Sequence, residues 1–182
     1  MLDNVKSKYI LKEILEKIKN KRKLNIIKYN KKVLFKLNIN KEDFEIYITL
    51  KEFNNKYHSN IEDVDIKELN LKEKYIGNEG LKNLFKIKFK ELKKLILYSN
   101  EIFDIDIIEK VKLTKLKLLI LSDNNISDIS ILEKVNFNKL EQLDLNHNKI
   151  SDINILGKVN FKELQVLDLT DNKIIEDEND SK

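Results

Sequence analysis

Four asparagines recur in the second half of this chain at a constant spacing of 24 residues: Asn100, Asn124, Asn148 and Asn172. Each closes the same frame, in which leucines stand eight, five and three residues before the asparagine. A constant period of about 20 to 50 residues is typical of repeat architectures, where one unit buries its apolar side chains only by stacking on the next. The spacing therefore predicts a stack of similar coils.

Each unit divides into a strand and a return segment. In the strand segments leucines alternate with variable residues, which is the period of a half-buried strand; they are residues 94–97, 118–121, 142–145 and 166–169. The return segments combine a turn with a short helical pattern. Two of them, Ser130-x-x-Glu133 and Asp106-x-x-Glu109, match a capping box, and Asn154-x-x-Gly157 keeps only its first residue. We therefore predict parallel strands on one side and short helices on the other.

The frame L-x-x-L-x-L-x-x-N resembles the leucine-rich repeat, closest to the short intracellular type seen in phosphatase-regulator and internalin-like arrays. The resemblance implies an α/β solenoid with a parallel concave sheet, and a structural role for the four asparagines, whose amides satisfy buried backbone groups. A degenerate unit, Leu69-x-Leu71-x-x-Lys74, precedes them with lysine in place of asparagine. We expect five strands and assign residues 66–175 to the repeats.

The segments around the repeats give weaker patterns. Residues 1–43 carry apolar residues at helical spacing and predict a helical N-terminal cap. Within them, residues 7–27 resemble a divergent F-box that lacks the usual proline, cysteine and tryptophan, which implies a ubiquitin-ligase substrate receptor as an alternative. Residues 44–65 predict an irregular or degenerate first repeat, since residues 44–50 alternate as in a strand, or else a part of the cap. The acidic tail, 176–182, is expected to be disordered.

Composition bears on the partners. The chain has 182 residues, no cysteine and no apolar run of membrane-spanning or secretory-signal type, so we predict a cytoplasmic protein. Residues 1–60 carry 15 Lys/Arg against 7 Asp/Glu, and lysine clusters at 19–23 and 28–32 make a basic nucleic-acid-binding protein a further alternative. Lysine, asparagine and isoleucine are abundant and proline is absent, as in proteins from AT-rich genomes. We therefore expect neither nucleic acid nor a membrane as partner.

Residues with catalytic potential are few. The sequence contains no glycine-rich phosphate loop, nucleophile elbow or zinc-ligand spacing. The acidic residues Asp144 and Asp168 recur because of the repeat, and His147 stands between Asp123 and Asp171 as a single imidazole on a polar surface. We predict no enzymatic activity, no cofactor and no metal site.

The outward side chains of the predicted sheet form columns that cross the strands. In these columns Ile96, Tyr98, Leu118 and Ile120 become neighbours, and an acidic flank with one histidine lies beside them: Asp123, Asp144, His147, Asp168 and Asp171. An apolar patch with an aromatic member indicates an interface. We predict that these nine residues bind a protein partner bringing apolar and basic side chains.

Self-coverage of this patch stays open as an alternative. The N-terminal segment, or a second copy of the chain, would cover the same apolar side chains. The sequence also predicts an open sheet edge after the last strand, which allows a homodimer, because unpaired edges pair readily.

Overall fold

A computed structural model describes residues 41–61 and 64–175. The chain divides into two compact units, residues 1–48 and 49–182, and the first unit is described only from residue 41. Residues 1–40 of the cap predicted over residues 1–43, with the F-box-like segment, and the predicted acidic tail lie outside the described residues.

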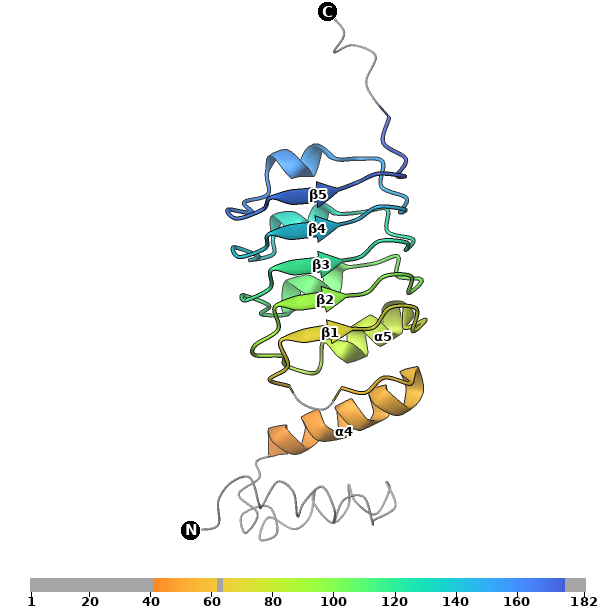
Figure 1. The fold of residues 1–182 in the computed structure, drawn as a ribbon, viewed down its shortest axis with the longest axis vertical. Coiled ribbons are helices and arrows are strands. Elements are labelled where there is room, and N and C mark those ends of the chain that lie inside the picture. Colours follow the sequence, from red (N-terminus) through yellow and green to blue (C-terminus); the bar gives the residue numbers. More distant parts are fainter. Residues whose placement is uncertain (1–40, 62–63, 176–182) are drawn as a thin grey trace, which may run out of the picture. The chain divides into compact units, whose positions relative to one another are not determined.

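Five short parallel strands build the sheet: β1 (Glu68–Asn70), β2 (Lys94–Ile96), β3 (Leu118–Ile120), β4 (Gln142–Asp144) and β5 (Val166–Asp168). Their order in the sheet is their order in the chain, and each strand pairs in parallel with the next. Figure 1 shows the five strands stacked side by side in chain order, from β1 to β5. The parallel sheet predicted from the 24-residue spacing is confirmed.

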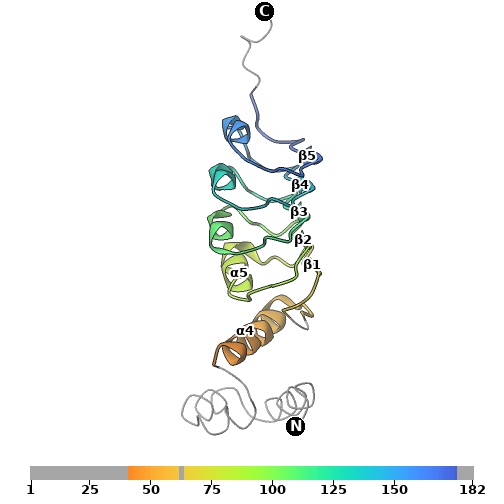
Figure 2. The ribbon, with the colours of Figure 1, turned by 90° about the vertical axis from the view of Figure 1, so that its left-hand side faces the viewer.

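The return segments run behind the sheet, as Figure 2 shows from the side. The first contains an α-helix, α5 (Gly77–Leu84), and the next three contain short 3-10 helices: η1 (Asp106–Lys110), η2 (Ser130–Glu133) and η3 (Asn154–Gly157). With strands on one side and helices on the other, the predicted α/β solenoid is confirmed.

The predicted capping boxes are wrong. The N-cap residues of the three 3-10 helices are isoleucines, whose side chains make no capping hydrogen bond. Instead, an aspartate two residues upstream accepts the backbone N–H of the first helical residue, as Asp128 does from Ser130 at 2.8 Å. Asp104 and Asp152 do the same at 2.9 and 2.8 Å. A local Asx turn thus replaces the box, because the aspartate accepts the N–H that the glutamate of a capping box would accept.

The core lies between the sheet and the return segments. Leucines of the strands fill it, and Leu95, Leu119 and Leu143 are at most 2% exposed. The equivalent residue of the last coil, Leu167, is 37% exposed. Burial in this fold depends on a neighbouring coil on each side, and β5 has a described neighbour on one side only.

Before the sheet stands a helix, α4 (Lys41–Tyr57), so the strand predicted over residues 44–50 is wrong. Leu50, Phe53 and Tyr57 are buried and follow one another by three and four residues, which places them on one helical face. The short alternating run resembled a strand, but the apolar spacing that continues through Phe53 and Tyr57 has the helical period. The predicted boundary at residue 43 falls inside this helix.

Gly80 of α5 provides a stability prediction. A methyl group there would stand 2.5 Å from Ile76 Cβ and 2.9 Å from the Tyr57 ring. We expect Gly80→Ala to lower the free energy of unfolding by about 1–3 kcal/mol through overpacking, despite the helix propensity of alanine. Gly157→Ala is the control, because a methyl group there would meet no atom within 4 Å. Urea unfolding measures both variants, and equal stabilities would show that the Tyr57 contact is loose.

Candidate functional site

A sharp bend follows every strand. The residue at the bend has a positive φ in all five coils, between 49° and 56°; these residues are Glu73, Ser99, Asp123, His147 and Asp171. A left-handed conformation costs a residue other than glycine about 1 kcal/mol. In the last four coils the residue after the bend is an asparagine, whose side chain points inward and bonds to the backbone of the preceding coil.

Asn124 shows what that inward side chain does. Its Oδ1 accepts hydrogen bonds from the N–H groups of Asn100 and Ile102, at 3.1 and 2.9 Å. Its Nδ2 donates to the carbonyls of Leu97 and Leu121, at 3.0 and 2.9 Å. One buried amide therefore satisfies backbone groups of two coils.

The same pattern continues along the stack. Asn148 bonds to Ile126 of the preceding coil, and Asn172 bonds to Ile150, both at 3.0 Å through Oδ1. The lysine that replaces asparagine in the first coil, Lys74, extends outward instead, and its Nζ donates to the His58 carbonyl at 2.9 Å.

The strand register brings four apolar side chains together on the concave face. Ile96 pairs directly with Ile120, Leu118 precedes Ile120 by two residues, and Tyr98 follows Ile96 by two. These four residues, Ile96, Tyr98, Leu118 and Ile120, are the apolar patch. All four are half-buried, whereas the sequence predicted them to be exposed. Side chains on adjacent strands about 4.8 Å apart cover part of each other.

Two carboxylates next to the patch are held in place. Asp144 accepts hydrogen bonds from Ser122 Oγ at 3.1 Å and from the N–H of Asn146 at 3.0 Å. Asp168 accepts from the N–H and the hydroxyl of Thr170, at 2.9 and 2.8 Å, and from Asn146 Nδ2 at 3.2 Å. These bonds, the one from the Thr170 backbone first, lower the pKa of Asp168, so this carboxylate stays charged.

The rest of the acidic flank lies at the bends. His147 Nδ1 is 3.4 Å from an Asp171 carboxylate oxygen, and both side chains are mostly exposed. Asp123 stands at the equivalent position of the preceding coil. Within residues 41–61 and 64–175, no group of three or more histidine, cysteine, aspartate or glutamate side chains has the arrangement of a metal site.

One contributor to this face was missed by sequence reasoning. Lys72 Nζ lies 4.6 Å from the centre of the Tyr98 ring, a cation–π contact, and 3.4 Å from Glu73. The sequence places Lys72 and Tyr98 in the same column of adjacent coils, 26 residues apart, but the predicted binding residues did not include Lys72.

A shallow pocket of about 260 Å³ lies at the β1 end of the sheet, lined by residues 59–61, 66 and 68–71. No residue of the apolar patch lines it. The apolar patch thus lies outside this pocket, on the surface of the adjacent strands β2 and β3.

The repeats match a known protein family. The family model described as "Leucine Rich repeats (2 copies)" matches residues 114–158 and 138–181. These matches cover β3, β4 and β5 completely, and the same strand, bend and inward asparagine recur at β2. Over residues 114–181 the chain therefore consists of leucine-rich repeats.

Two solved structures are similar, both from Listeria monocytogenes. An internalin (inlF) has 29% sequence identity and a TM-score of 0.40, over 51% of this chain and 24% of that one. An internalin C2 (inlC2) has 21% identity and a TM-score of 0.36, over 70% of this chain and 85% of that one. The chain thus spans about a quarter of the first protein. A search of curated proteins gave no match.

Among the helices of the described residues, none has the length and apolar character needed to cross a membrane.

Proposed function

We propose that this protein is a non-catalytic binding module that holds a protein segment on its concave face. The observation that carries the proposal is the apolar patch beside fixed carboxylates on the neighbouring strands. Apolar side chains supply affinity by losing water, and charges at the rim select the partner. The fitting partner brings an aromatic or aliphatic anchor together with lysine or arginine.

The size of the face supports a helix or a loop as the bound element. The four spacings between its five strands, at about 4.8 Å each, give a sheet about 20 Å across. A helix with its side chains is about 10–12 Å wide, so one helix fits on the sheet and reaches both patch and flank.

Other sequence-based predictions remain predictions. The F-box alternative depends on residues that are not described. The cytoplasmic location depends on composition alone. A homodimer through the open edge is favoured by the exposure of Val166 and Leu167, 47% and 37%. Sedimentation of the full chain tests it: a purely monomeric protein at about 100 µM excludes a dimer with low-micromolar Kd.

A paired substitution on the concave face tests the proposed function. We expect Tyr98→Ala with Ile120→Ala to weaken binding at least about tenfold, because truncation of interface anchors costs more than about 1 kcal/mol each. The partner is first purified by affinity from native cells with the full chain, and its binding is then titrated by calorimetry.

The matched control is Ile107→Ala. Ile107 is also half-buried but belongs to η1, on the opposite side of the coil. It should leave binding unchanged. If the double variant instead lowers the melting temperature strongly and binding is retained by the folded fraction, the patch is intramolecular core and the proposal is wrong.

A further inference from the structure

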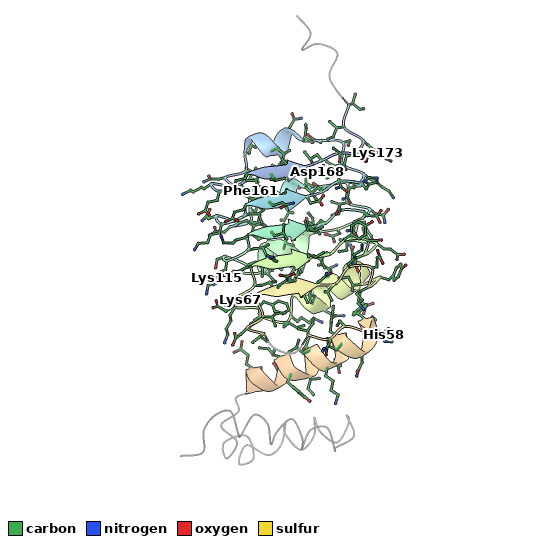
Figure 3. The ribbon with its side chains drawn as sticks, in the orientation of Figure 1. His58, Lys67, Lys115, Phe161, Asp168 and Lys173 are labelled. Atoms are coloured by element: carbon green, nitrogen blue, oxygen red, sulfur yellow. The ribbon has the colours of Figure 1, made fainter. Side chains whose placement is uncertain are left out.

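The two edges of the repeat stack differ in charge. The entry edge, where the chain approaches each strand, comprises residues 86–93, 110–117, 134–141 and 158–165. It contains 12 lysines and 3 glutamates. The exit edge, where the chain leaves each strand, comprises residues 97–105, 121–129, 145–153 and 169–175, with 2 lysines and 6 acidic residues. The formal charges are therefore +9 and −4. Figure 3 shows Lys115 on one edge and Lys173 on the other.

The lysine content of the chain does not account for this difference. The two edges have similar lengths, 32 and 34 residues, and a general bias toward lysine would place it on both. The sequence-based expectation against a nucleic-acid partner rested on that bias. Once the fold assigns each residue to an edge, the lysines gather on one edge only. A general lysine bias therefore no longer argues against a nucleic-acid partner.

Most of these lysines are available to a ligand. Lys115 and Lys117 form ion pairs with Glu91 and Glu141. Lys112 and Lys134 are exposed, and no ion pair is described for either. Lys134 follows a short helix, so the helix end accounts for its position in part, but Lys112 lies beyond any helix terminus.

The side chains that are missing from the entry edge define the class of ligand. The exposed large apolar residues of the described chain lie outside its four segments: Tyr75, Phe103, Ile153, Val166, Leu167 and Ile175. A bilayer surface is bound by charge combined with apolar insertion, and single-stranded nucleic acid by aromatic stacking. The segments also contain no arginine, the usual reader of guanine in base-specific contacts.

We propose that the entry edge binds the phosphate backbone of double-stranded nucleic acid without regard to sequence. Lysines on successive coils stand about 4.8 Å apart, and a duplex presents one charge per about 1.7 Å of its axis. Several lysines therefore meet phosphates at once. The site is separate from the concave face, so a protein segment and a duplex bind at different surfaces of one coil.

Fluorescence anisotropy with the full chain and two labelled 20-base-pair DNA duplexes of unrelated sequence tests the proposal. We expect similar affinities for both and a steep loss of affinity with salt. The variant Lys112→Gln with Lys134→Gln should bind at least about fivefold more weakly at low salt. The slope of log K against log salt should become shallower by about 2, since each lost phosphate contact removes about 0.9.

The control is Lys149→Gln with Lys173→Gln, which removes the same charge from the exit edge and should keep wild-type affinity and slope. Circular dichroism confirms that both variants fold. Equal weakening by the two variants, no effect of Lys112 and Lys134, or no duplex binding at about 50 mM salt would overturn the proposal. Tighter binding to single strands or to vesicles with anionic lipids would also overturn it. The concave-face variant Tyr98→Ala with Ile120→Ala should bind duplex normally, which separates this test from the proposed function.

Discussion

Replacing Leu143 by alanine is expected to lower the free energy of unfolding by about 3–4 kcal/mol, the range of leucine truncations in rigid cores. Leu143 is 0% exposed and belongs to β4, which pairs with β3 on one side and with β5 on the other. The substitution leaves a cavity, and the coils on both sides keep the surrounding side chains from moving into it. The lost contacts are therefore not replaced. Thermal unfolding followed by circular dichroism should show a melting temperature lower by about 10 °C.

Leu167→Ala is the control for this result. Leu167 occupies the same position of the frame in the next unit but is 37% exposed. Its truncation removes less buried area and leaves space open to solvent, so we expect a loss of about 1 kcal/mol. Equal losses at the two positions would show that another coil or a second chain covers Leu167 in solution.

The second large effect is expected for Asn124→Ala, with a loss of about 3 kcal/mol. The side chain is 8% exposed and makes five hydrogen bonds to the backbone. Alanine leaves the N–H groups of Asn100 and Ile102 without these bonds, and each unsatisfied buried group costs about 1–3 kcal/mol. Urea unfolding of the purified variant measures the loss.

The neighbouring variant Asn125→Ala is the control. Asn125 is half-buried and no hydrogen bond of its side chain is described, so its truncation should change stability by less than about 0.5 kcal/mol. A stable Asn124→Ala protein would mean that water replaces the amide, and the structural role assigned to the four asparagines would then fail.

Sequence reasoning succeeded where one residue pattern has one physical solution. Leucines that recur every 24 residues bury themselves only in stacked coils, so the parallel order and the pairing of Ile96 with Ile120 followed directly. It failed over residues 44–50, where a short apolar alternation fitted strand and helix alike. It also failed at Ser130, where an aspartate upstream competes with the capping box for the same N–H.

The repeat period by itself determined the solenoid, the order of the strands and the columns of the concave face, because these depend only on position within the unit. The tertiary structure alone decided how buried each member of a column is and how charge divides between the two edges. Leu143 and Leu167 have the same place in the frame and different exposure. The burial of a side chain and the electrostatic potential at a surface both depend on the residues nearby in space. Those residues come together only when the coils stack.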